Sequence, residues 1–69
     1  MYSWPDGRLY KGEYVDDRKE GKGVLSWPDG RVYDGYWSKG RKHGIGKFSK
    51  PGMSPRKGEW NYGRRVRWI

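Results

Sequence analysis

The sequence predicts an all-β fold: an elongated, open antiparallel sheet of successive β-hairpins, stacked as in a repeat protein. Three observations predict it. A 23-residue block recurs without a gap, its residues alternate with period 2, and glycine recurs in register with tyrosine and tryptophan. No stretch has helical spacing of adequate length. We therefore divide the single domain 1–69 into the end of a preceding unit (1–3), two full units (4–26 and 27–49) and a partial capping unit (50–69).

Aromatic side chains are expected to form the core. Only 32% of the 69 residues are hydrophobic and 35% are charged, which alone would be typical of disorder. The chain nevertheless has five Trp and six Tyr, each with a large apolar area. Cysteine is absent, so disulfides and thiolate metal sites are excluded. We expect a reducing, cytoplasmic setting.

The first strand of each unit carries aromatic residues and glycine on one face. In the first unit Tyr10, Gly12 and Tyr14 occupy every second position, and polar residues occupy most of the others. This alternation is typical of a strand with one buried face. The corresponding residues of the later units are Tyr33, Gly35, Trp37, Gly58 and Trp60.

The returning strand of each unit is rich in glycine. Gly21, Gly23 and Leu25 share one face in the first unit. A strand glycine leaves bare backbone that an aromatic ring on a neighbouring strand can cover, and we expect Tyr14 and Trp37 to do so. We interpret the rings as core, with stacking on a ligand as the alternative. The second unit repeats this strand with Gly44, Gly46 and Phe48.

A turn links each unit to the next. Pro5-Asp6-Gly7 and Pro28-Asp29-Gly30 combine a proline that presets φ with a glycine that accepts positive φ. Trp4 and Trp27, just before these turns, are predicted to be packing residues. Each unit is thus a hairpin, and a Pro-Asp-Gly turn leads into the following one.

These motifs resemble those of the MORN (membrane occupation and recognition nexus) repeat family. Y-K-G-E-Y (10–14) and Y-D-G-Y-W (33–37) are similar to its Y-x-G-x-W signature, and G-R-K-H-G-I-G (40–46) to its G-x-x-H-G-x-G turn. The resemblance extends from Tyr2 to about Arg65. It implies antiparallel hairpins in a twisted open sheet, and roles in protein interaction, often in cytoskeletal or cortical assemblies.

Three departures from the family pattern are evident. Arg56 stands where the third unit should have tyrosine, and Asp17 replaces the turn glycine of the first unit. The segment 66–69 lacks H-G-x-G altogether, so we interpret the third unit as a terminal cap. In sequence alignment, Gly23 and Gly46 fall in the column of Ile69.

Catalytic chemistry has little basis in this sequence. His43 is the only histidine and matches the structural histidine of the family turn, with a general-base or metal role as the alternative. Asp16 and Asp17 are adjacent acids that we interpret as solvated turn residues. The glycines follow strand spacing and do not gather in a phosphate-binding loop. We therefore expect no enzyme activity, no cofactor, no metal site and no small-molecule substrate.

Basic residues recur in the same two columns of all three units. The net charge is +8, and charge accumulates along the chain: five basic and five acidic residues in 4–26, five and two in 27–49, six and one in 50–69. Because two strands advance about 10 Å, the paired columns predict a basic ladder along one sheet edge. The ladder either keeps the open sheet soluble or binds anions. Its members are Arg18, Lys19, Arg41, Lys42, Arg64 and Arg65.

Two functions follow, in order of preference. The first is a non-catalytic scaffold or protein-interaction module, at the membrane cortex or cytoskeleton. The alternative is a module that binds anionic phospholipid through the basic hairpin tips. Nucleic-acid binding is disfavoured because the rings are needed in the core. Since the chain opens in the middle of a unit, we also expect it to be a segment of a larger protein.

The C-terminal residues are candidates for self-association. Trp68 and Ile69 form an apolar tip on a chain with few apolar residues. Trp68 either covers the last hairpin or joins two copies tail to tail.

Overall fold

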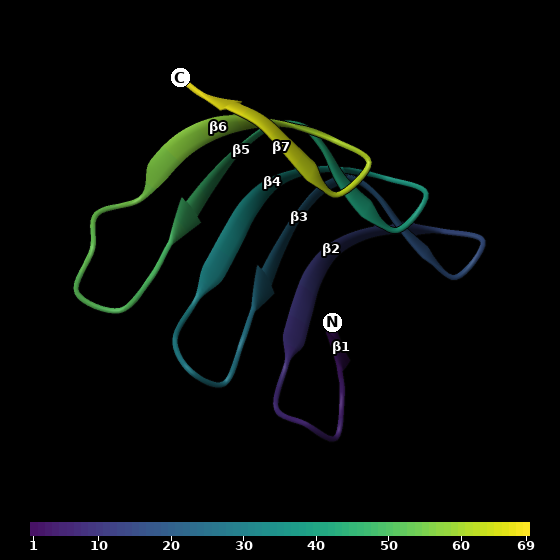
Figure 1. Ribbon diagram of the computed structural model, residues 1–69. Helices are drawn as coiled ribbons and strands as arrows, with labels where there is room; N and C mark the ends of the chain where they lie inside the picture. Colours follow the sequence, from purple (N-terminus) through teal and green to yellow (C-terminus); the bar gives the residue numbers. More distant parts are fainter.

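The computed structural model describes all 69 residues as a single sheet of seven antiparallel strands. The strands lie in chain order, so each pairs with its neighbours in the sequence (Figure 1). This confirms the predicted open sheet of successive hairpins. With no helix in the chain, nothing helical is present that could cross a membrane. The strands are β1 (Tyr2–Ser3), β2 (Leu9–Val15), β3 (Arg18–Ser26), β4 (Val32–Ser38), β5 (Arg41–Ser49), β6 (Arg56–Asn61) and β7 (Arg64–Trp68).

Three two-residue turns lie along one edge of the sheet. They are Asp16-Asp17, Lys39-Gly40 and Tyr62-Gly63, and both residues of each have positive φ, between 47° and 91°. Such turns match the right-handed twist of the strands that they join. Aspartate tolerates this conformation better than most residues, so Asp17 preserves the turn that glycine makes in the other units.

The opposite edge carries the longer Trp-Pro-Asp-Gly loops. In the first loop the Gly7 N–H donates to the Trp4 carbonyl at 3.0 Å, and the Trp4 N–H donates to the Arg8 carbonyl at 2.9 Å. The loop after β3 repeats both bonds with the same distances. Loops of this form hold Trp4 and Trp27 against the sheet, where both are half-buried, as predicted.

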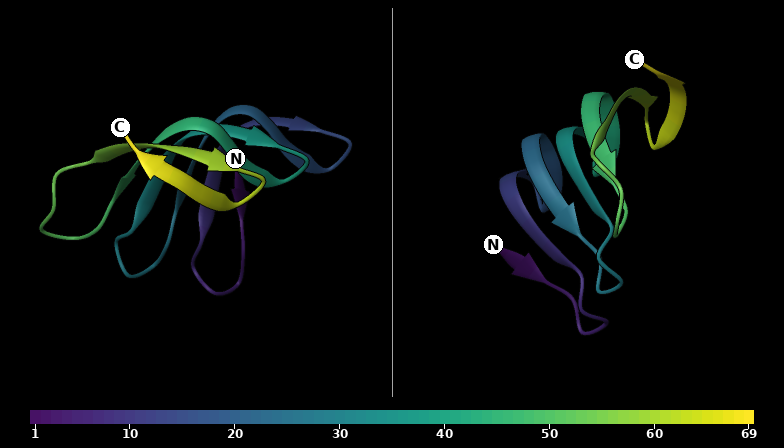
Figure 2. Two further views of the ribbon diagram at one scale, coloured as in Figure 1. Left: turned by 45° about the horizontal axis from the view of Figure 1, so that its top comes forward. Right: turned by 90° about the vertical axis from the view of Figure 1, so that its left-hand side faces the viewer.

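A bulge in each full unit bends the sheet. The register between β2 and β3 shifts between Gly12 and Tyr14, and the extra residues of β3 include Gly21 at φ +68°. Gly44 has φ +80° at the corresponding place in β5. Bulges of this kind increase local bending and twist, and the strands arch over one concave side (Figure 2). Gly21 and Gly44 therefore provide curvature. The sequence predicted rings over the glycines of these strands, but the nearest side-chain atoms at Gly21 belong to Glu13, and at Gly44 to the Cβ of Tyr36.

Aromatic rings on the concave side form the core. Tyr10, Tyr33, Trp37 and Trp60 are buried together with Leu25, which confirms the predicted burial of Tyr10, Trp37 and Trp60. Adjacent rings meet at 5.0–6.0 Å between centroids, mostly edge to face, the geometry that aromatic pairs prefer. The series crosses the sheet in the order Tyr2, Tyr14, Tyr10, Trp37, Tyr33, Trp60 and Trp68.

The rings that cover the glycines are not the predicted ones. Tyr10 lies over the Gly12–Gly23 pair, and Tyr33 lies over the equivalent pair in the second unit. Trp37 does lie against the glycine column, since its Nε1–H donates to the Gly23 carbonyl at 3.1 Å, whereas Tyr14 is 39% exposed. The reason is that a ring at the start of β2 projects diagonally onto the next glycine pair.

The buried tyrosine hydroxyls are also satisfied. The Tyr10 hydroxyl donates to the Glu13 carbonyl, and the Tyr33 hydroxyl to the Tyr36 carbonyl, each at 3.0 Å. Both carbonyls lie at the bulge, so each tyrosine joins the core to the bend. Burial raises the pKa of Tyr10 and of Tyr33 to about 12, because an ionised phenol would lose its hydration.

The third unit departs from this arrangement. Arg56 stands in the tyrosine column, and two rings lie over Gly58: Trp60 from its own strand and Trp68, which pairs with Gly58 from the opposite strand. The alignment that placed Ile69 there is wrong by one residue, because the β6–β7 bulge is shorter than the other two.

Candidate functional site

The predicted basic ladder is in fact two rows. Neighbouring residues of a strand face opposite ways, so the first residue of each basic pair is exposed on the outer side and the second turns toward the concave face. The prediction of a single basic ladder at the hairpin tips is therefore wrong for Lys19 and Lys42, which are half-buried. The outer row is Arg18, Arg41 and Arg64; the inner row is Lys19, Lys42 and Arg65.

The inner lysines lie on aromatic rings. The Lys19 Nζ is 5.2 Å from the ring centroids of both Trp4 and Trp37, and 5.8 Å from that of Tyr10. Burial, and then the nearby Arg8, lower the pKa of Lys19. Ring faces attract such cations because their π electrons are negative, so Lys19 is held in place without a carboxylate.

Lys42 repeats this environment one unit later. Its Nζ lies 5.2 Å from the Trp27 centroid and 5.6 Å from that of Tyr33. Burial again lowers the pKa of Lys42, with Arg31 as the second cause. In both units, therefore, burial beside the rings and a neighbouring arginine disfavour the charged form of the lysine.

An arginine accompanies each inner lysine. The Arg8 guanidinium lies 4.9 Å from the Trp4 centroid, and that of Arg31 lies 5.1 Å from Trp27. Asp6 and Asp29 fix these arginines through ion pairs of 2.9 and 2.8 Å. The backbone N–H of Arg31 is the main cause of the lowered pKa of Asp29. Sequence reasoning missed these arginines, although their recurrence beside the Trp-Pro-Asp-Gly motif was a signal.

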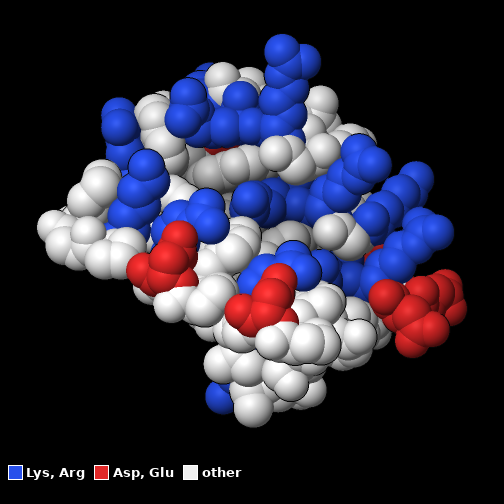
Figure 3. All heavy atoms as spheres, turned by 60° about the horizontal axis from the view of Figure 1, so that its bottom comes forward, with Lys and Arg blue, Asp and Glu red and all other residues white.

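The third unit has two arginines over one ring. The guanidinium carbons of Arg56 and Arg65 lie 4.5 and 4.7 Å from the Trp68 centroid. Neither takes part in an ion pair. Rows of Lys and Arg cross the concave side, interrupted by a few acidic groups (Figure 3). The inner row and its companions form what we call the concave cation row: Arg8, Lys19, Arg31, Lys42, Arg56 and Arg65.

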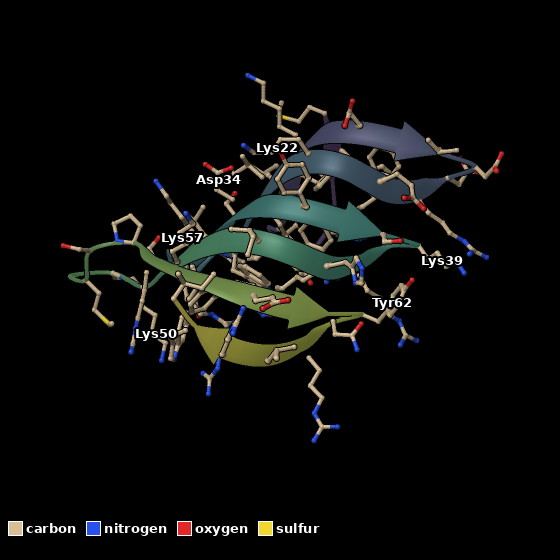
Figure 4. The ribbon with its side chains drawn as sticks, turned by 90° about the horizontal axis from the view of Figure 1, so that it is seen from above. Lys22, Asp34, Lys39, Lys50, Lys57 and Tyr62 are labelled. Atoms are coloured by element: carbon tan, nitrogen blue, oxygen red, sulfur yellow. The ribbon has the colours of Figure 1, made fainter.

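Successive tight turns are fastened to one another. The Lys39 N–H donates to Glu20 Oε1 at 2.8 Å, and the Tyr62 N–H donates to His43 Nδ1 at 3.3 Å. The Tyr62 and His43 rings also lie 4.3 Å apart. Lys39 and Tyr62 both stand at the tight-turn edge, far from Lys50 on the loop edge (Figure 4). His43 thus has the structural role that the sequence predicted.

The C-terminal candidates separate in the structure. Trp68 is half-buried against Trp60, with centroids 5.9 Å apart and rings perpendicular, so it covers the last hairpin. Ile69 is 60% exposed. No partner chain is present, so tail-to-tail association remains a prediction.

Acidic and imidazole groups do not gather at one place in the sheet. No three of the Asp, Glu and His side chains gather as metal ligands would, and Asp16 and Asp17 occupy a tight turn. The concave cation row is instead suited to bind negative charge.

The fold and the site define an open β-hairpin repeat module with a cationic, ring-lined concave face. The MORN repeat family model matches residues 10–30 and 33–52, and the chain belongs to this family. MORN repeats are interaction modules for proteins or membranes and are not known as catalytic. Among curated proteins, none matches this chain significantly.

Proposed function

We propose that this chain is a non-catalytic protein-interaction module that holds an acidic segment of a partner protein along its concave face. The concave cation row carries this proposal. Six cations lie on one face, and only two of them, Arg8 and Arg31, are paired with carboxylates. The remaining four positive charges favour an acidic ligand.

The rings make the row a suitable binding surface. Each cation is positioned over tryptophan at 4.5–5.2 Å from the ring centroid. Positioning before binding reduces the side-chain entropy lost when a ligand arrives. Because units repeat every two strands, cations recur at about 10 Å, and an extended segment with acidic residues every third position, at about 3.3 Å per residue, matches that spacing.

The inner lysines and the outer arginines next to them in sequence provide a matched test of this binding surface. We expect Lys19→Gln/Lys42→Gln to weaken binding of a fluorescent octaglutamate peptide at least tenfold at low salt. Arg18→Gln/Arg41→Gln removes the same amount of charge from the neighbouring column, on the outer side. We expect this variant to weaken binding no more than about threefold, through the overall electrostatic field of the protein. Fluorescence anisotropy measures both. Equal losses would reduce the interaction to net charge and refute the proposal.

A phospholipid role is the second candidate, favoured by the outer row. Arg18, Lys39 and Arg41 line one shallow hollow with Tyr62 at the tight-turn edge, where a flat anionic surface has access. Each such cation contributes about 1 kcal/mol near an anionic membrane. Vesicle sedimentation with phosphatidylserine tests this: the outer-row variant should lose binding and the inner-row variant should keep it.

Cellular placement and self-association are part of the proposal. We expect a cytoplasmic location at the cortex or cytoskeleton, testable by imaging the tagged protein. Association through Ile69 and the edge of Trp68 should strengthen with salt, because basic residues near that end repel one another. Sedimentation velocity of the wild type and of Trp68→Ala tests it, and a monomer at all concentrations would refute it.

A further inference from the structure

The third unit contains a hollow where the first two units are filled by rings. Lys50 stands in the repeat position of Trp4 and Trp27, and Arg56 stands in that of Tyr10 and Tyr33. The exchange of rings for flexible cations leaves a space of about 350 Å³ on the concave side, within the usual range for ligand pockets. Its apolar walls are Phe48, Met53, Trp60 and Trp68.

Positive charge lines this hollow without any acid. Lys42, Lys50, Arg56 and Arg65 contribute four cations from β5, the β5–β6 loop, β6 and β7. In the first two units an aspartate in the loop pairs with an arginine, but the third unit has Gly52 at the aspartate position. The hollow is therefore lined by four cations and no carboxylate.

The two arginines of the hollow share one ring and have no carboxylate partner. Both guanidinium groups lie on the Trp68 ring, at 4.5 and 4.7 Å from its centroid, and neither has an ion pair. Guanidinium forks suit phosphate oxygens, and lysines add point charges. A single carboxylate would balance one of the four cations, whereas a phosphate monoester carries up to two negative charges and three acceptor oxygens.

We propose that this hollow binds a phosphorylated aromatic side chain of the partner segment, with the phosphate between Arg56 and Arg65 and the aryl ring against the apolar wall. This rests on the proposed function, since it adds a specific residue to the acidic segment. The hollow is lined from β5, the β5–β6 loop, β6 and β7, and the strands of the sheet curve around one concave side (Figure 2). A side chain on an extended segment reaches it, whereas the flat surface of a bilayer meets the rim first.

Two peptides test the site in the intact chain. Both are acidic octapeptides that differ at one central position, which is phosphotyrosine in one peptide and glutamate in the other. We expect the phosphorylated peptide to bind at least tenfold more tightly in titration calorimetry. We also expect free phosphotyrosine to shift the Trp68 indole signal in the NMR spectrum more than inorganic phosphate does.

Matched variants locate the preference. Arg56→Gln/Arg65→Gln should abolish the tenfold preference, whereas Arg8→Gln/Arg31→Gln, with the same loss of charge, should weaken both peptides and keep it. Lys50→Trp should fill the hollow and remove the preference, while Lys50→Gln, which removes the charge alone, should retain part of it. Circular dichroism confirms that each variant is folded.

The outcomes separate the two proposals. Equal affinity for both peptides overturns the phosphate site and leaves the acidic-segment proposal standing. Weak binding of both peptides, while free phosphotyrosine still shifts Trp68 in the wild type and not in Arg56→Gln/Arg65→Gln, supports the hollow and overturns the acidic segment. Binding of vesicles that carry phosphorylated headgroups, lost in the same variant and without a phosphopeptide preference, overturns the assignment to a protein side chain.

Discussion

The first two units and the third use one backbone pattern with different side chains. In the full units a buried tyrosine covers a pair of glycines and bonds to the bulge that bends the strand. In the third unit Arg56 replaces that tyrosine, and Trp60 and Trp68 together cover the single remaining glycine, Gly58. The same sheet position holds a tyrosine ring in the first two units, whereas in the third unit it holds an arginine that lines a hollow.

This difference teaches where a repeat protein has freedom to bind. Internal units must pack on both sides, so their concave positions are constrained by neighbouring rings. Within residues 1–69 the third unit pairs with the second unit alone, and its concave positions accept Lys50, Arg56 and Arg65 without loss of the hairpin. The third unit therefore both departs from the repeat pattern and gains cations that have no carboxylate partner.

Substitution of the paired glycines should give the largest effect and the clearest contrast between units. A Cβ at Gly35 would collide with the Gly46 backbone and lie 2.9 Å from the Ile45 carbonyl. Backbone cannot retreat without breaking the ladder, so we expect Gly35→Ala to cost more than about 3 kcal/mol and to unfold most of the chain. Urea titration followed by tryptophan fluorescence measures the loss.

Gly58→Ala is the matched change in the third unit. The atoms nearest its Cβ would be ring carbons of Trp60 and Trp68, at 3.0 Å, and these side chains can shift. We expect a loss of about 1–2 kcal/mol with the fold retained. Equal losses at the two glycines would contradict the idea that the third unit is the looser one.

Sequence patterns predicted the frame of this molecule well because period-2 alternation and turn chemistry are local. Strands, turns and the buried Tyr10, Trp37 and Trp60 followed from the repeat alone. Which ring covers which glycine did not follow, because that depends on the diagonal offset between strands. The bulges set this offset, and the positive φ of Gly21 and Gly44 cannot be distinguished in a sequence from that of any other strand glycine.

The candidate site was only half predictable for the same reason. The basic columns were visible, but their division between two faces depends on where the strand begins after the tight turn. Arg8, Arg31 and Arg56 joined the site only when the loops brought them over tryptophan. Their charges were counted in the sequence, but their common face was not visible there.

Alkaline titration should distinguish the tyrosine-filled units from the third. Below pH 10 the buried phenols are protonated in both folded and unfolded chains, and they give no pH dependence. Between pH 10 and about 12 only the unfolded chain ionises Tyr10 and Tyr33, so stability falls as pH rises, by about 1.4 kcal/mol per pH unit for each tyrosine. Chemical denaturation at several pH values measures the slope.

The lysines set the lower limit of this pH window. Lys19 and Lys42 have lowered pKa values, so their contribution to stability rises up to about pH 10.5 and is constant above it. Tyr10→Phe/Tyr33→Phe should therefore flatten the slope between pH 10.5 and 12. A slope unchanged in this variant would place the ionising groups elsewhere.

Removal of Trp68 should loosen the third unit alone. The ring covers Gly58 and packs on Trp60, but it is only half-buried, so we expect Trp68→Ala to cost about 2 kcal/mol, less than a fully buried tryptophan. Hydrogen exchange should quicken in β6 and β7 and stay unchanged in β2 and β3. Faster exchange throughout the sheet would show that the units unfold as one.

The smallest effect should come from the bonds that fasten one tight turn to the next. His43→Ala removes the acceptor for the Tyr62 N–H together with the stacked ring, and we expect it to cost about 1 kcal/mol. The Gly63 N–H keeps its 2.7 Å bond to the Lys42 carbonyl, so only the Tyr62 amide should exchange much faster.

Glu20→Ala tests the equivalent bond between the first two units at Lys39, where a charged acceptor at 2.8 Å should make the loss somewhat larger. His43→Gln, whose side-chain carbonyl can accept, should slow Tyr62 exchange again. Since Val66 follows in this column and has no polar group to offer, the chain of fastened turns ends at the third unit. Unchanged Tyr62 exchange in His43→Ala would show that the β5–β6 ladder protects this turn without the histidine.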